Sequence, residues 1–408
     1  MKHNDDFSSV QYGIFHSQEI YELERDLIFS KAWTYLCLEA EIPNPGDFLT
    51  AEIGDIPVLV NRREDGVITA FENRCMHRGT KLRRENRGNA ADHTCVYHQW
   101  CYSLDGRLTS VPFPRGVRGV GGLPADFDKS KVRLPPMRVE VMHGVVFGTF
   151  DPDNVPLEEY LGPEIVARLG NLFFKPIEII GYQRQRVFGN WKLYNENLRD
   201  LNHGSLLHMF HATFGLARPN QVGGSMMDAK RRHNISRKVM GTDDKSLTVE
   251  LYKDVKSYQE DFVLSDPSIL KYTPEIPHEE SLIIASVFPN VIFQQITNSL
   301  CSRQIRLRGV DEFELYWTYY GFKDDTPEMR EHRRRQANLV GPGGLISMED
   351  GEAVQLVHEQ TRSRLEESSQ IIIGGRGEIK DLPVGVTEMP VRGFWSYYFE
   401  LMDSAQSA

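Results

Sequence analysis

The chain has 408 residues, which is too long for one ordinary hydrophobic core, so two domains are expected. With 40% hydrophobic and 25% charged residues, its composition is typical of a soluble globular protein. It contains no run of about 18 apolar residues, so no membrane span is predicted. A formal net charge of −10 argues against nucleic acid as a main partner, because binding to phosphates needs a basic face.

The cysteines are sparse and odd in number, which is not the pattern of a disulfide framework. A secretory signal has an apolar stretch behind a basic start, and the N-terminal residues do not show this pattern. We therefore expect a reduced, cytoplasmic setting in which clustered cysteines serve a metal. The five cysteines are Cys37, Cys75, Cys95, Cys101 and Cys301.

In chain order, residues 17–32 carry apolar residues at helical spacing and predict a helix. From Trp33 to about Phe150, short apolar or alternating runs separated by Gly, Pro and Asp predict a small all-β domain. Residues 152–162 are typical of a linker into a second unit. The expected domains are an N-terminal helical segment packed on the second unit (1–32), the β domain (33–151) and the second unit (152–408).

The second unit is predicted to be α+β. Residues 191–214 predict a helix with an interruption, and four strand-like runs between residues 281 and 322 predict an antiparallel sheet. Further helices are expected at about 351–367 and 389–402.

The β domain contains a Cys-x-His pair and a Cys-x-x-His pair joined by seventeen residues. Zinc sites usually take two cysteines from one turn and two histidines from one helix, whereas here each loop supplies one of each. The mixed arrangement suits a Rieske [2Fe–2S] centre, with structural zinc as the alternative. The candidate ligands are Cys75, His77, Cys95 and His98.

A second cluster of metal-ligand types lies in the interrupted helix. Asp200 and His203 share a helical face, but His203 and His208 point about 140° apart on a regular helix. A break near Gly204 would bring both rings to one metal, while His208 and His211 form a rival pair. Two histidines and a carboxylate form the facial triad of non-haem Fe(II) oxygenases. The helix start near residue 350 offers three carboxylates: Glu349, Asp350 and Glu352.

Alternation along residues 299–307 places Arg303 on the less polar face of a strand, together with Cys301 and Ile305. A guanidinium on such a face needs an anion to offset its desolvation. That anion is either an internal carboxylate, in a salt bridge, or the carboxylate of a substrate.

Taken together, the two motifs resemble the large (alpha) subunit of the Rieske non-haem iron aromatic ring-hydroxylating oxygenases. The resemblance covers nearly the whole chain and includes YLCLEAEIPNPGDF, CVYHQW, GNWKLYNENLRD, SLLHMF and SMEDGEAV. Within the family it is strongest to the subunits that act on terephthalate, and it extends to those for salicylate and anthranilate. It implies an all-β Rieske domain and an α+β catalytic domain, whose antiparallel sheet and helices carry a mononuclear iron.

The resemblance also implies roles for individual residues. The cluster ligands would be Cys75, His77, Cys95 and His98, and the mononuclear Fe(II) ligands would be His203, His208 and Asp350.

The same resemblance implies that Asp200 is catalytic, because it matches the aspartate that links a cluster histidine of one subunit to an iron histidine of its neighbour. Arg303 and Arg392 are the implied substrate-binding residues, and Glu196 is a further candidate for the iron environment.

The implied activity is hydroxylation of an aromatic acid with O₂ and with electrons from NAD(P)H. These electrons arrive through a separate flavin and iron–sulfur reductase, with or without a ferredoxin. A trimer is implied, either α3 or α3β3 with a small beta subunit. The first expectation is cis-dihydroxylation of a terephthalate-like acid. The alternatives are monohydroxylation of a salicylate-like acid and dioxygenation of anthranilate or 2-halobenzoate. A protein that only carries electrons would lack the second metal centre.

Overall fold

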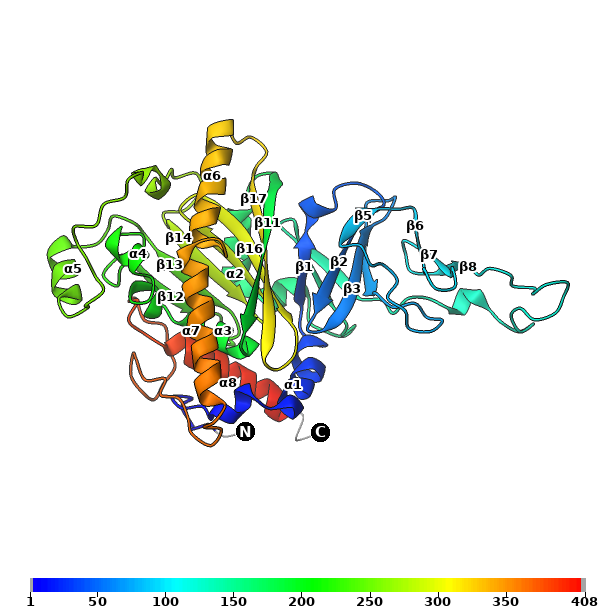
Figure 1. The fold of residues 1–408 in the computed structure, drawn as a ribbon, viewed down its shortest axis with the longest axis horizontal. Coiled ribbons are helices and arrows are strands. Elements are labelled where there is room, and N and C mark those ends of the chain that lie inside the picture. Colours follow the sequence, from blue (N-terminus) through cyan, green and yellow to red (C-terminus); the bar gives the residue numbers. More distant parts are fainter. Residues whose placement is uncertain (1–2, 405–408) are drawn as a thin grey trace. The chain divides into compact units, whose positions relative to one another are not determined.

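The computed structural model describes residues 3–404, and its contacts divide the chain into two units (Figure 1). One unit is Phe29–Leu157, and the other combines the residues before and after it. The first unit extends a few residues beyond the expected 33–151 at both ends. Within residues 3–404, no helix has the length and the apolar character needed to cross a membrane.

The first unit is built from three small antiparallel sheets, as predicted for an all-β domain. The sheets have the orders β1-β10-β9, β4-β3-β2-β5 and β6-β7-β8. The strands are β1 (Thr34–Leu38), β2 (Asp47–Ile53), β3 (Ile56–Arg62), β4 (Ile68–Glu72), β5 (Arg87–Asn89), β6 (Asp92–Thr94), β7 (Cys101–Ser103), β8 (Leu108–Ser110), β9 (Arg138–Met142) and β10 (Val145–Thr149).

The second unit is organised around one seven-stranded antiparallel sheet of order β11-β17-β16-β15-β14-β13-β12. The four predicted runs form β14 to β17, which lie side by side in chain order. The other three strands were not predicted, because β11 is polar and half exposed and β12 is short and begins with two glycines. The strands are β11 (Ile177–Phe188), β12 (Gly223–Met227), β13 (Asn234–Lys238), β14 (Leu282–Val287), β15 (Val291–Ile296), β16 (Ser299–Leu307) and β17 (Glu312–Phe322).

Helices surround this sheet, with α6 packing on β16 and α7 on β11. The expected N-terminal helix is shorter than predicted and ends in a π-helical turn at Arg25–Phe29. The segment expected to be a linker is helical from Leu157, and α6 was not predicted. The helices are α1 (Gln18–Glu24), α2 (Leu157–Leu172), α3 (Trp191–Arg199), α4 (Met209–Thr213), α5 (Lys245–Tyr252), α6 (Pro327–Val340), α7 (Leu345–Thr361) and α8 (Met389–Ser404).

Within the second unit, a buried carboxylate joins the N-terminal segment to the C-terminal part of the chain. Glu24, at the end of α1, accepts hydrogen bonds from Trp191 Nε1 (2.7 Å) and Lys192 Nζ (2.6 Å) of α3. It also accepts one from the Tyr398 hydroxyl of α8. Glu24 and Lys192 are fully buried, so each charge depends on the other for its compensation. This pairing holds α1, α3 and α8 together.

We predict that Glu24→Ala lowers the stability of the second unit by about 3 kcal/mol or more, because it leaves the Lys192 ammonium buried without a partner. Urea unfolding followed by circular dichroism measures the loss. Glu22→Ala is the control, since Glu22 is exposed on the same helix and should cost less than about 1 kcal/mol. Equal losses in the two variants would contradict the role given to the buried pair.

Candidate metal centres and substrate cavity

Two loops of the first unit carry the predicted cluster ligands, and their backbones match. In each loop, the cysteine N–H donates to the carbonyl five residues later, at 2.8 Å. In each loop, the fourth residue after the cysteine has a positive φ, 73° at Gly79 and 57° at Gln99. The loops that begin at Cys75 and Cys95 therefore turn in the same way, although the histidine is the second residue after the cysteine in one loop and the third in the other.

The structure brings the four predicted ligands of these loops together. The thiols of Cys75 and Cys95 are buried in the core, whereas His77 is exposed and His98 is half-buried. The two imidazole rings lie 4.5 Å apart at 76°, and Trp100 stacks on His77 at 4.7 Å. Two sulfur ligands inside and two nitrogen ligands at the surface fit an asymmetric two-iron cluster with one outward edge.

Tyr102, on β7, supports the sulfur side of this site. Its hydroxyl lies 3.4 Å from Cys75 Sγ and accepts a hydrogen bond from the Met76 N–H (3.0 Å). Burial raises the pKa of the Cys75 thiol, while the contact with Tyr102 favours the thiolate. Hydrogen bonds to cluster sulfurs are one of the means by which a protein tunes cluster potential.

The second centre depends on where α3 ends. Asn190 caps its start, accepting from the Lys192 N–H (3.1 Å), and Asp200 leaves the helical conformation at φ −86° and ψ 97°. The Asp200 carboxylate then accepts the N–H groups of Asn202 (2.8 Å) and His203 (3.3 Å). The break therefore comes before His203, not near Gly204 as expected, and Asp200 and His203 do not share a helical face.

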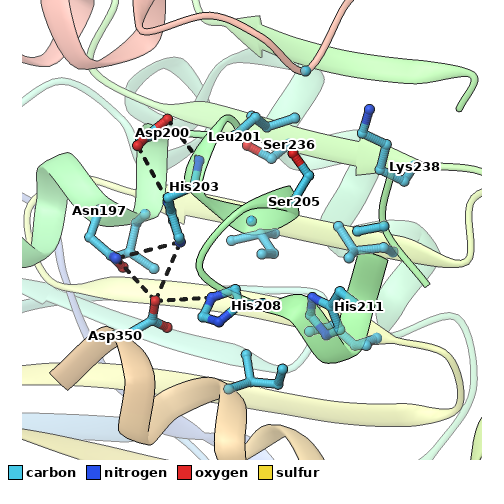
Figure 2. A pocket seen from close by; sticks show the side chains of 18 of the residues that line it. Asn197, Asp200, Leu201, His203, Ser205, His208, His211, Ser236, Lys238 and Asp350 are labelled. Atoms are coloured by element: carbon cyan, nitrogen blue, oxygen red, sulfur yellow. Dashed lines mark hydrogen bonds and ion pairs between the residues drawn. The ribbon is translucent and has the colours of Figure 1, made fainter. Parts of the chain in front are cut away.

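Beyond this break, two histidines meet one carboxylate (Figure 2). Asp350 Oδ1 lies 3.3 Å from His203 Nε2 and 3.1 Å from His208 Nε2. One ligand atom from each of the three residues falls within 4.8 Å of the others. The rival partner His211 is outside this group, with its ring 5.5 Å from that of His208. Asp350 belongs to the second turn of α7, because the helix starts earlier than predicted.

Further polar groups hold the triad from outside. Asn197 Nδ2 donates to Asp350 Oδ1 (3.0 Å), and Glu349 Oε2 lies 2.7 Å from His208 Nδ1. Asp200 Oδ2 lies 3.5 Å from His203 Nδ1. Carboxylates behind both histidines are the usual outer layer of a metal site, where they fix ring orientation. The sequence offered Glu349 as a candidate carboxylate but gave no signal for Asn197.

Glu196 does not take part in this site. Its carboxylate accepts a hydrogen bond from Trp395 Nε1 (2.6 Å), away from the triad. Burial, with the nearby carboxylates of Glu388 and Asp200, raises the pKa of Glu196 to about 7. The neighbouring residue Asn197, not Glu196, contacts the triad.

The electrostatics of the triad suit a cation. Burial alone would lower the pKa of His203, but hydrogen bonds with Asp200 and Asp350 raise it to about 10. The pKa of Asp350 is held far below its usual range, because the two imidazoles outweigh its burial. Positive charge between these groups is strongly favoured, and a divalent metal supplies it without protons.

A second group of metal-ligand types, His16, Asp311 and His358, is less suited to a metal. The two imidazoles stack at 4.3 Å and 28°, so their nitrogen lone pairs run side by side and do not converge. The Asp311 carboxylate also forms an ion pair with Arg362, at 2.9 Å.

A cavity adjoins the triad and extends over one face of the sheet. A concave, largely apolar wall with a few polar groups is typical of a small-molecule site. The wall is mainly apolar, with side chains from α3, the sheet and α6. Its apolar lining includes Leu201, Leu282, Ile284, Ile296, Val340 and Ile346.

Arg303 lines this cavity, on the face given by the alternation of β16. It is 3% exposed, donates to the Tyr194 hydroxyl (2.8 Å) and lies over the Trp317 ring (4.7 Å). Its Nε has no hydrogen-bond partner, and no carboxylate of the described residues lies within ion-pair distance. The structure therefore shows no internal salt bridge for Arg303.

Arg392 differs from the expectation, because it lies outside the cavity. Its guanidinium donates to the carbonyls of Asp6 (2.8 Å), Gly375 (2.9 Å) and Gly377, and it pairs with the Asp6 carboxylate (3.4 Å). These partners saturate the side chain, so it fastens the N-terminal segment to the 375–377 loop.

Lys238 is a cavity residue that the sequence analysis missed. It ends β13, is 4% exposed, and its Nζ has no hydrogen-bond partner. Burial lowers its pKa to about 8. Strand alternation would have pointed to it if β13 had been recognised.

Both halves of the chain match known families. Residues 32–121 match the Rieske [2Fe-2S] domain, and residues 178–404 match the catalytic domain of the ring-hydroxylating alpha subunit.

Three relatives match almost the whole chain. The large subunit of anthranilate 1,2-dioxygenase from Burkholderia cepacia is 43% identical, over 98% of this chain and 94% of its own. The terminal oxygenase alpha subunit 2 of terephthalate 1,2-dioxygenase from Comamonas sp. is 42% identical, over 98% and 96%. The large oxygenase component of salicylate 5-hydroxylase from Ralstonia sp. is 40% identical, over 97% and 94%.

The fold is that of naphthalene 1,2-dioxygenase from Rhodococcus sp., with a TM-score of 0.79 and 24% identity over 97% of this chain and 94% of that one. Sequence and fold agree with the geometry of the two metal centres. The chain belongs to the Rieske-type ring-hydroxylating oxygenases, as a large subunit that carries a [2Fe–2S] cluster and a mononuclear iron.

Proposed function

We propose that this oxygenase hydroxylates the ring of an aromatic carboxylic acid and that Arg303 binds the acid group. The observation that carries the proposal is a fully buried guanidinium, without an internal carboxylate, in the wall of the cavity beside the triad. An anionic substrate would supply the missing partner through a charge-assisted hydrogen bond. The names of the three relatives, which refer to anthranilate, terephthalate and salicylate, support the same chemical class.

The ligand assignment belongs to this proposal. The cluster is held by Cys75, His77, Cys95 and His98, and the mononuclear iron by His203, His208 and Asp350. When bound, the cluster would supply electrons, and the mononuclear iron would supply the oxygen-activating chemistry.

The remaining residues of the site position the substrate and the ligands. Arg303 fixes the acid group, and the apolar wall orients the ring and excludes water. Glu349 and Asn197 hold two of the proposed ligands in place. Asp200 lines the substrate cavity and also a separate hollow behind α3 that contains Glu196 and Glu388.

A group between two hollows is well placed to connect the iron site with a neighbouring chain. We therefore keep Asp200 as the bridge for electrons from the cluster of a second subunit, in an α3 or α3β3 assembly.

The relatives do not separate the individual acids, because their identities are nearly equal at 43%, 42% and 40%. Cis-dihydroxylation of a terephthalate-like acid remains our first candidate, with monohydroxylation of a salicylate-like acid as the alternative. Arg392 does not help in this choice, since it lies outside the cavity.

The proposed assignment of the iron ligands predicts that His208→Ala keeps the cluster spectrum and loses the mononuclear iron. Iron content should fall from about three to about two atoms per chain, and turnover should be lost. His211→Ala is the matched control, since His211 lies one helical turn away but outside the triad. Loss of the third iron in His211→Ala, with retention in His208→Ala, would reverse the assignment.

The substrate proposal predicts that Arg303→Ala lowers kcat/KM for the acid by roughly 30-fold or more, as expected for loss of one partner of a buried charge pair. Product formation and oxygen uptake would be measured with reductase for terephthalate, salicylate, anthranilate, benzoate and 2-halobenzoate, and for benzamide.

Arg306→Ala is the control for this experiment, because Arg306 is on the same strand but on its other face. If Arg303→Ala turns over benzoate as fast as wild type does, and the same holds for benzamide, the acid-binding role is refuted.

A separate reductase requires a docking surface near the exposed edge of the cluster. The loop after His77 carries basic residues, of which Lys81 and Arg84 are exposed, whereas Arg83 binds His93 (2.9 Å) and covers Phe48. Exposed basic groups steer an acidic partner, and the effect weakens with salt.

We predict that reversing Lys81 and Arg84 to Glu slows reduction of the cluster by the reductase about tenfold at low salt, and less at high salt. Stopped-flow absorbance of the cluster measures this rate. Reversal of Arg115 and Lys131, which are also exposed on this unit, is the control. Equal rates in the two variants would exclude the loop as the docking surface.

A further inference from the structure

The cavity contains a second buried cation. Lys238 Nζ has no hydrogen-bond partner, and the side chain is 4% exposed. Gly385, which also lines the cavity, leaves room for the ammonium, because a Cβ at that position would lie 2.9 Å from Nζ. A buried charge without an anion is costly, so an ammonium kept here in the wall of a substrate cavity indicates a binding site for an anion.

Strand register places Lys238 far from Arg303 on the same face of the sheet. Lys238 pairs with Leu282, Leu282 with Ile296, and Ile296 with Ser299, which lies four residues before Arg303 on β16. Three strand spacings of about 4.8 Å and four residues of about 3.4 Å place the Cα atoms of Lys238 and Arg303 roughly 20 Å apart. With their Cα atoms this far apart, the two side chains bind two separate anionic groups and not the same one.

The surface between the two cations suits an aromatic ring. Leu282, Ile284 and Ile296 lie on the strands between them and line the same cavity. In Figure 2, Lys238 lies across the cavity from Asp350, beyond Ser205 and Ser236.

Besides Lys238 and Arg303, the cavity wall contains one further arginine, which is not available to bind an anion. Arg218 also lines the cavity, but it is already paired with Asp243 (2.6 Å).

From this arrangement we infer that Lys238 forms a second anion subsite, so that the preferred substrate is an aromatic acid with a second carboxylate on the opposite side of its ring. The inference rests on the proposed function, because it takes the first carboxylate to be bound by Arg303. Arg392, the other arginine implied to bind substrate, does not line the cavity and so is not a candidate for this subsite.

The test compares terephthalate with benzoate in the iron-loaded oxygenase. Isothermal titration calorimetry gives the two dissociation constants, and their ratio is the preference for the dicarboxylate. Wild type should prefer terephthalate, and Lys238→Met should reduce that preference at least tenfold. Lys245→Met, an exposed change nearby in the chain, should leave the ratio as in wild type.

A second measurement covers the case in which Lys238→Met fails to fold. The ammonium loses its charge as pH rises through its lowered pKa of about 8, so kcat/KM for terephthalate should fall above that pH. Lys238→Arg should abolish this fall, since a guanidinium stays charged. Gly385 faces the Lys238 ammonium, and burial is the cause of the lowered pKa of Lys238. The other titratable residues of the cavity wall are Arg218, which is paired with Asp243, together with Asp200, His203, His208, His211, Arg303 and Asp350.

Failure of the inference differs from failure of the proposed function. Equal binding of benzoate and terephthalate by wild type, or an unchanged ratio in Lys238→Met, would overturn the second subsite. Acid turnover that still depends on Arg303 would leave the function in place. If wild type binds neither acid and turns over neutral rings alone, the proposed function fails, and the second subsite fails with it.

Discussion

One carboxylate oxygen organises the catalytic unit. Asp350 Oδ1 is shared by His203, His208 and Asn197, at 3.0 to 3.3 Å. The histidines and the amide come from the chain around the end of α3, whereas the carboxylate comes from α7. The two segments converge only if α3 stops at Asp200, because a continued helix would turn His203 and His208 to different sides. The Asp200 side chain stabilises that stop by accepting the next free N–H groups of the chain.

The placement of α7 is equally constrained. Gln185 of β11 donates to the Ser347 carbonyl (2.7 Å), and a Cβ at position 351 would lie 2.8 Å from the same amide. Glycine at 351 therefore allows the helix to approach the sheet directly after Asp350. Glu24 joins α1 to α3 through the buried Lys192 and to α8 through the Tyr398 hydroxyl. The helix that supplies Asn197 and Asp200 is thus fixed at its first turn by a charge pair and at its last turn by a cap.

Sequence patterns predicted the features that depend on neighbouring residues in the chain. The Cys-x-His and Cys-x-x-His pairs predicted two loops in an all-β domain, and strand alternation put Arg303 on the cavity face. They failed for features that depend on contacts a local pattern does not include. The helix break moved from Gly204 to Asp200, because the Asp200 carboxylate binds backbone N–H groups that a propensity argument does not count. Resemblance alone placed Arg392 at the substrate, but its local partners, Asp6 and the 375–377 loop, hold it elsewhere. Lys238 was missed because β13 has no strong periodic signal.

The same unit contains two histidines, three residues apart, with opposite electrostatics. His208 is held on both ring edges by adjacent residues of α7, Glu349 at 2.7 Å and Asp350 at 3.1 Å, and these carboxylates raise its pKa despite burial. His211 is buried without such a partner, and burial together with the nearby His208 lowers its pKa to about 3. His211 is therefore a neutral imidazole in the wall of the cavity. The carboxylates that distinguish His208 from His211 come from α7 and not from the chain that carries the two histidines, which is why local spacing left both pairs open.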